Sequence, residues 1–156
     1  MKITEILTPK FIIPAFKADT KEGIINELVD LFKDDPRVIS LDQVRDAVLQ
    51  REKIMSTGVG KGFGLPHGKT EGVKEILAAF GISKTPVAYQ SLDNNPVNLV
   101  FLLVGKENMV SSHIKLLSRI SRMMNKDEFR ENLLKASSSE EIYSLFKVEE
   151  ESYIDL

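Results

Sequence analysis

The sequence predicts a single α/β domain in which helices flank a mixed β-sheet. Two short apolar runs, KEILAAFGIS at residues 74–83 and PVNLVFLLVG at residues 96–105, are bounded by proline, glycine and asparagine, as buried strands are. Segments with helical periodicity precede both runs and follow them. The length of 156 residues suits one domain with one sizeable core.

Two amphipathic helices are expected before the strands. Residues 19–35 place their isoleucine, leucine and phenylalanine side chains on one stripe of a helix. In residues 40–54, Ser40 with a glutamine three residues later is a start signal, and an apolar stripe runs through Val48. The next position on that stripe is Arg51, so we expect a cation on the apolar face near the end of this helix.

Three further helices are expected after the strands, over residues 111–124, 125–136 and 137–146. The first of them has an apolar stripe, and counting back along this stripe reaches His113 in the first turn. The acidic segment 148–156 shows no clear period. We therefore expect a folded domain over residues 1–147 and a separate acidic C-terminal tail over residues 148–156.

Composition and charge exclude several classes of function. The net charge is -2 and the pI is near 5.8, which argues against a surface selected for nucleic-acid phosphates. The chain has no cysteine, so disulfides, thiolate zinc sites and cysteine nucleophiles are excluded. No segment approaches about 20 consecutive apolar residues, and the N-terminus lacks the apolar run of a signal peptide. We expect a cytoplasmic protein that does not insert into a membrane.

The stretch GVGKGFGLPHGKTEG, residues 58–72, is unusually rich in glycine. It does not fit a nucleotide-binding loop, because the pattern G-x-x-x-x-G-K-[ST] requires glycine where this chain has Phe63. A metal site is not indicated either, since the chain has only two histidines, His67 and His113, without helical ligand spacing. An ordinary surface turn stays open as an interpretation, with alternate residues on one face of an extended chain: Gly58, Gly60, Gly62 and Gly64.

A surface turn does not explain His67, which directly follows Pro66. The proline fixes its own φ and holds the preceding residue extended, so the histidine is presented stiffly, and Gly68 leaves room beside it. Taken singly, Arg51 has an ordinary explanation as a snorkelling side chain and His113 as a core-edge residue. Together with His67 they suggest a small site that binds an anion, because helix N-termini attract anions and histidine is a covalent acceptor of phosphate.

One specific motif is spread over three segments: REKIMSTGVGKGFGLPHGKTEGV at residues 51–73, DNNPVNLVFLLV at 93–104 and HIKLLSRISRMM at 113–124. The motif orders arginine-glutamate, serine-threonine-glycine, alternating glycines and proline-histidine, with a second histidine opening a later helix. It resembles the fructose/mannitol-type enzyme IIA domain of the bacterial phosphoenolpyruvate-dependent sugar phosphotransferase system. The likeness covers nearly the whole chain and is strongest to the stand-alone nitrogen-regulatory enzyme IIA. It implies the type-2 enzyme IIA fold for residues 1–147.

The resemblance also implies a phosphocarrier, which is a phosphotransferase in the enzymatic sense. His67 maps to the phosphoryl acceptor, which becomes a tele-phosphohistidine, and His113 maps to the residue that stabilises the phosphoryl group. Arg51 and Thr57 map to supporting positions. The implied donor is a histidine-containing phosphocarrier protein, and the implied acceptor is an enzyme IIB or a regulatory target protein. The family requires no cofactor and no metal, and we expect no nucleic-acid partner.

Two biological roles compete within this hypothesis, and two other classes of function stand beside it. A regulatory role, in which phosphorylation controls binding to other proteins, is favoured by the resemblance over a role as a separate component of sugar transport. A binding module that kept the fold and lost phosphotransfer is the main alternative, and the pair His67 and His113 argues against it. A hydrolase with His67 as general base lacks an identifiable nucleophile.

Overall fold

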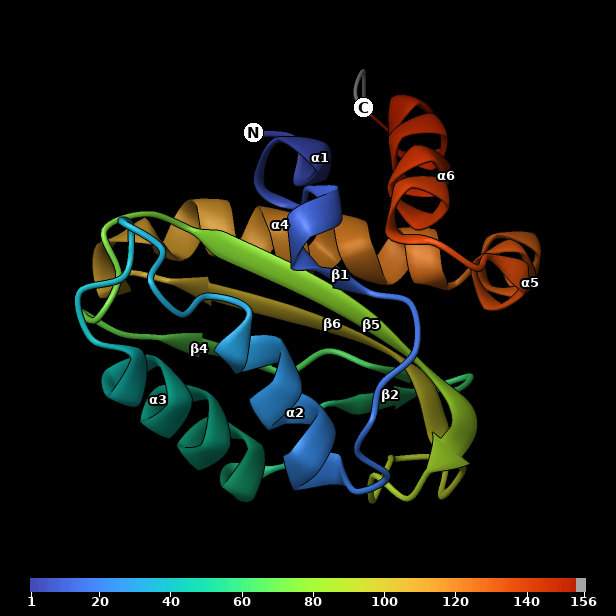
Figure 1. The fold of residues 1–156 in the computed structure, drawn as a ribbon, viewed down its shortest axis with the longest axis horizontal. Helices are drawn as coiled ribbons and strands as arrows, with labels where there is room; N and C mark the ends of the chain where they lie inside the picture. Colours follow the sequence, from blue (N-terminus) through green and yellow to red (C-terminus); the bar gives the residue numbers. More distant parts are fainter. Residues whose placement is uncertain (154–156) are drawn as a thin grey trace.

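This computed structural model describes residues 1–153, which form one mixed sheet with helices along both of its sides (Figure 1). In this view α2 (Lys21–Asp30) and α3 (Leu41–Ile54) lie on one side of the strands. The other side carries the short α1 (Ile3–Ile6), α4 (Val110–Met124) and α6 (Ser139–Glu151), and α5 (Asp127–Lys135) joins the last two. The predicted fold class is confirmed.

The sheet has six strands in the order β1-β5-β6-β3-β2, and β4 also pairs with β6. Their bounds are Ile12–Ile13, Gly58–Gly60, Phe63–Gly64, His67–Lys69, Leu77–Val87 and Val97–Gly105 for β1 to β6. The two predicted strands are β5 and β6, which pair antiparallel at the centre. Nearly all of β6 is buried, because helices cover both faces of the sheet, and this explains its unbroken apolar sequence.

The short strands β3 and β4 lie end to end along the same edge of β6. Phe63 is opposite Leu99 and His67 is opposite Leu103, so the register stays the same on either side of the interruption. Pro66 has no N–H to donate, but its carbonyl accepts a hydrogen bond from the backbone N–H of Leu103 at 3.1 Å. This pairing fixes His67 against the central strand of the sheet.

The predicted helices are confirmed, with differences at their ends. The first predicted helix begins after Thr20, whose hydroxyl caps the N–H of Gly23, and it ends at Asp30, before residue 35. The start signal at Ser40 is confirmed, since its hydroxyl accepts from the N–H of Gln43. Within residues 1–153, no helix has the length and the apolar character needed to cross a membrane.

Helix α6 continues across the boundary that the sequence placed at residue 147. It begins after Ser138, whose hydroxyl accepts from the N–H of Glu141, and it runs through Glu151. The part of the predicted tail up to this residue is therefore helical, because Glu150 turns inward and is buried against the N-terminal segment. The rest of the predicted tail is described only to Tyr153, and residues 154–156 lie outside the described part.

Candidate functional site

His67 opens β4 with its ring half-buried and oriented by one hydrogen bond. Its Nδ1 lies 2.8 Å from the carbonyl oxygen of Leu65. A carbonyl oxygen only accepts, so Nδ1 carries the proton, and Nε2 of the neutral ring keeps its lone pair. Burial lowers the pKa of His67, and the positive charge of Arg51 adds to this, against the opposing effects of the Leu65 bond and Glu52. The favoured form is therefore the neutral imidazole with Nε2 as the nucleophilic atom.

His113 lies in the first turn of α4 beside His67, with the two ring centroids 5.9 Å apart. Its side chain is 1% exposed, and neither ring nitrogen has a hydrogen-bond partner among residues 1–153. Burial, and then the neighbouring His67, lower the pKa of His113 to about 4. A Cβ atom at Gly105 would lie 3.2 Å from Nδ1 of this ring, so a residue with a side chain at this position would crowd the imidazole. The result is a neutral, buried ring with unused polar atoms.

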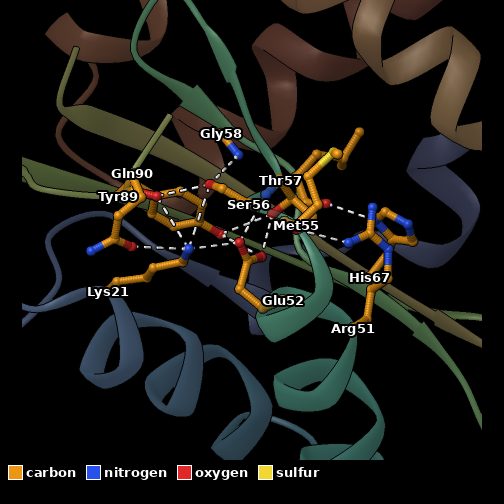
Figure 2. Close-up of polar contacts among 11 residues, drawn as sticks. Lys21, Arg51, Glu52, Met55, Ser56, Thr57, Gly58, His67, Tyr89 and Gln90 are labelled. Carbon is orange, nitrogen blue, oxygen red and sulfur yellow. Dashed lines mark hydrogen bonds and ion pairs between the residues drawn. The ribbon is translucent and has the colours of Figure 1, made fainter. Parts of the chain in front are cut away.

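The buried position near the end of α3 is Glu52, not Arg51 as the apolar stripe predicted. Val44, Val48 and Glu52 follow one another at four-residue spacing, and this spacing defines the inward face of the helix. Arg51 is only half-buried, and its guanidinium donates to the carbonyl of Met55 at 2.8 Å, past the last turn of α3. In Figure 2 it lies beside the ring of His67, in agreement with its effect on the pKa of that ring.

The hydroxyl of Thr57 is bonded to two buried side chains, those of Glu52 and Tyr89. It donates to Glu52 Oε1 at 2.5 Å and lies 3.1 Å from the hydroxyl of Tyr89. Its backbone N–H donates to the other Glu52 oxygen at 2.8 Å. Thr57 is 4% exposed. In the unmodified protein the Thr57 side chain is thus engaged with Glu52 and Tyr89, and the supporting role that the resemblance implies for it stays a prediction.

Two further residues of this region were given no role from the sequence: Glu52, which the motif contains, and Lys21, which lies outside it. Lys21 Nζ lies 2.8 Å from Glu52 Oε2, and it also donates to the carbonyl of Tyr89 at 3.1 Å (Figure 2). The signal for Glu52 was its place four residues after Val48. Lys21 carried no such signal, because it comes from another helix and only the fold brings it near.

The glycine stretch forms a hairpin, so it does contain the turn that the sequence left open, but its alternate glycines do not all lie in one extended strand. β2 and β3 pair antiparallel, and the turn between them has positive φ at Gly60, Lys61 and Gly62. Another segment approaches the backbone closely at Gly58 and Gly64. A Cβ atom at either position would lie within 3.0 Å of the Tyr89 ring, so the hairpin is laid directly on this ring.

Gly68 does not leave room beside the imidazole, which corrects another expectation. Successive residues of a strand point to opposite faces of the sheet, so Gly68 faces away from the ring of His67. A Cβ atom there would lie 3.2 Å from the backbone of Ala47 and Val48, and β4 thus packs closely on α3. Among residues 1–153, no group of three or more metal-ligating side chains comes together.

Comparison with known families agrees with this arrangement. Residues 5–148 match the family described as phosphoenolpyruvate-dependent sugar phosphotransferase system, EIIA 2, and the chain belongs to this family. Its relatives include a nitrogen regulatory protein of Bradyrhizobium diazoefficiens, which is 33% identical over 93% of this chain and 94% of the relative. The fructose-specific EIIABC component of Bacillus subtilis is 37% identical over 93% of this chain, which spans only 23% of that protein.

Solved structures show the same fold. The nitrogen regulatory protein IIA-Ntr of Neisseria meningitidis has a TM-score of 0.86 and 32% identity, covering 92% of this chain and 98% of that one. An Escherichia coli complex of enzyme IIAMtl with phosphorylated enzyme IIBMtl contains a chain with a TM-score of 0.75 and 21% identity, covering 89% of this chain and 95% of that one. At this identity the second likeness concerns the fold alone.

Proposed function

We propose that this protein is a phosphocarrier that accepts a phosphoryl group on Nε2 of His67. The donor would be the phosphohistidine of a histidine-containing phosphocarrier protein. The N–P bond of the donor breaks and its electron pair stays on the donor ring, while the lone pair of His67 Nε2 forms the new N–P bond. The protonated donor ring leaves as neutral imidazole, and the positive charge moves to the ring of His67, whose Nδ1–H donates to the carbonyl of Leu65.

The observation that carries this proposal is the pairing of His67 with His113. A buried imidazole without a hydrogen-bond partner is unfavourable, and the two rings are 5.9 Å apart. A phosphoryl group on His67 would give His113 an oxygen to which one N–H donates. The guanidinium of Arg51 adds positive charge near the ring of His67, which suits the charge of the transferred group (Figure 2).

The downstream role that we favour is regulatory, with the phosphorylation state of His67 controlling binding to a target protein. The support is the likeness to nitrogen regulatory proteins over 94% of one relative and 98% of one solved chain. A role in sugar transport, with an enzyme IIB as acceptor, is the second candidate. It is favoured by the fructose-specific EIIA component of Haloferax volcanii, which is 36% identical over 91% of this chain and 94% of that protein.

The experiment that tests the proposal is incubation with phosphoenolpyruvate and the upstream phosphocarrier proteins, followed by intact-mass spectrometry. We expect one acid-labile phosphate on the wild-type chain and none on His67→Ala. Label retained by His67→Ala, or a phosphate that survives acid as phosphoserine does, would overturn the assignment. A wild-type chain that folds but takes up no phosphate would favour the binding module of the same fold.

A pull-down that compares the unmodified and phosphorylated forms separates the two downstream roles. Capture of an enzyme IIB would favour transport, whereas capture of a different protein by only one of the two forms would favour regulation.

A further inference from the structure

A buried polar cluster lies next to the proposed site, where Glu52 directly follows Arg51 near the end of α3. We call it the Glu52 cluster, and it consists of Lys21, Glu52, Thr57 and Tyr89. One carboxylate is its centre, accepting from both the N–H and the hydroxyl of Thr57, from the hydroxyl of Tyr89 at 3.3 Å, and pairing with Lys21 at 2.8 Å. The Glu52 side chain is 6% exposed, so these bonds act in a water-poor setting where they strongly fix geometry.

The Glu52 cluster is connected to the His67 ring by consecutive hydrogen bonds. Glu52 holds the N–H of Thr57, and the carbonyl of Thr57 accepts from the N–H of Leu65 at 3.0 Å. The carbonyl of Leu65 in turn accepts from Nδ1 of His67 at 2.8 Å. Pro66 stiffens the link between Leu65 and His67. A shift of Thr57 would therefore displace the one acceptor that selects the tautomer of the histidine.

The Tyr89 ring packs against the β2–β3 hairpin and so helps to fix the same chain of hydrogen bonds. Gly58 and Gly64 lie against this ring with no space for a Cβ atom, and both strands of the hairpin therefore rest on it. The hydroxyl of the ring is tied to Glu52 and Thr57. The carboxylate thus fixes the strand before the turn directly and the strand after it through Tyr89.

We infer that Glu52 is a positioning residue for His67, holding Thr57 and Leu65 so that the carbonyl of Leu65 keeps Nδ1 protonated and Nε2 free for the phosphoryl group. This inference deepens the proposed function and rests on it for its catalytic consequence. The orientation of the ring itself does not depend on phosphotransfer. It is therefore measurable in the unmodified protein.

The chain offers matched controls for this inference. Glu150, on the opposite side of the sheet, accepts from the N–H of Thr4 at 3.0 Å and from its hydroxyl at 2.9 Å, as Glu52 does from Thr57. Glu52→Gln is therefore compared with Glu150→Gln, and the milder Thr57→Val with Thr4→Val. Urea denaturation measures the stability of each variant, so that rates are referred to folded protein.

Two readouts decide the outcome. One is the ¹⁵N chemical shifts of the His67 ring in unphosphorylated protein, and the other is the rate of single-turnover phosphoryl transfer from the phosphorylated donor protein. We expect the wild type to hold the Nδ1–H tautomer and Glu52→Gln to show a mixture of both tautomers. We expect its transfer to slow by about 10- to 100-fold, as misplacement of a reacting atom by about 1 Å does. Thr57→Val should shift both readouts in the same direction by less, and both controls should match the wild type.

Equal tautomers and equal rates in Glu52→Gln and Glu150→Gln would show that Glu52 only stabilises the fold. If Glu52→Gln does not fold, the pair Thr57→Val and Thr4→Val decides in the same way. If even the wild type takes up no phosphoryl group, the proposed function fails. The ¹⁵N shifts then still decide whether Glu52 orients His67.

Discussion

Two buried glutamates are bound in nearly the same way and hold different parts of the molecule. Glu52 accepts from the N–H and the hydroxyl of Thr57, and Glu150 accepts from the N–H and the hydroxyl of Thr4. Each also meets a cation, since Lys21 pairs with the first glutamate and an arginine of α4 with the second. The chemistry of the two clusters therefore does not distinguish them.

The difference lies in what each glutamate holds. Glu52 ties the end of α3 to the hairpin that leads to His67. Glu150 ties α6 to the first turn of α1, and its partner Arg119 also donates to the carbonyl of Met1 at 2.9 Å. A buried carboxylate cluster is thus informative about function only through the segment it fixes. The same bonds serve the proposed site in one place and join α6 to α1 in the other.

The largest effect on stability is expected from Glu150→Ala. The change leaves the N–H groups of Ile3 and Thr4 without their acceptor and Arg119 without its carboxylate partner, in a place where the glutamate is 1% exposed. Breaking such a buried pair should lower the free energy of unfolding by about 3–5 kcal/mol. Urea denaturation measures this loss. Transfer to His67 per folded molecule should stay at the wild-type rate, and a slowed transfer would break the comparison.

The next effect concerns His113, which shares α4 with the Arg119 that pairs with Glu150. His113→Ala should still accept one phosphate on His67, but slowly, since losing one donor in a dry site costs about 2.7–4 kcal/mol of transition-state stabilisation. A partly open site should lose less. Rapid-quench transfer in both directions compares the wild type, His113→Ala and His67→Ala. Wild-type rates in His113→Ala would reduce His113 to a core-edge residue, and uptake by His67→Ala but not by the double variant would reverse the two roles.

A pH dependence of stability should follow from the same ring. Its folded pKa of about 4 is below the usual value of 6.5, so the stabilisation is present above pH 6.5 and is lost as the pH falls towards 4. Between pH 7 and pH 5 the loss from this group should be about 2 kcal/mol. Urea denaturation at both pH values should show a larger loss for the wild type than for His113→Ala. Equal losses would show that the ring is not held in its neutral form, and Glu150→Gln should keep the wild-type dependence.

The smallest effect is expected from chelation. Both clusters contain carboxylates, but the described residues form no group of three or more metal-ligating side chains. EDTA should therefore leave phosphoryl transfer to this protein unchanged once the donor protein is already phosphorylated. Loss of single-turnover transfer in EDTA, restored by zinc or magnesium, would contradict this.

The sequence allowed prediction of elements whose signal is local or periodic. The apolar runs of β5 and β6 and the stripe of α4 gave strands, a helix and the inward place of His113. Pro66 before His67 marked the presented histidine. The short strands β2, β3 and β4 were missed, because two or three residues carry no period and gain their place only by pairing with longer strands.

The partners of the site were less predictable than its histidines. Arg51 was assigned to the buried stripe although Glu52 occupies it, since both positions continue an apolar face at helical spacing. Lys21 lies 31 residues before Glu52, and only the packing of α2 against α3 brings them together. The sequence did not predict that α6 continues into the expected tail. The buried residue of its last turn is Glu150, and a charged residue is expected on the surface from its hydropathy.

The most direct test of the central claim is the position of the phosphate on the His67 ring. After phosphorylation by the phosphorylated donor protein, two-dimensional ¹H–¹⁵N spectra of this protein identify which ring nitrogen bears phosphorus. Because Nδ1 is held by the carbonyl of Leu65, we predict a single phosphohistidine, bonded through Nε2, with Nδ1 still next to its acceptor. Phosphate on Nδ1 of His67, or on either nitrogen of His113, would contradict the account.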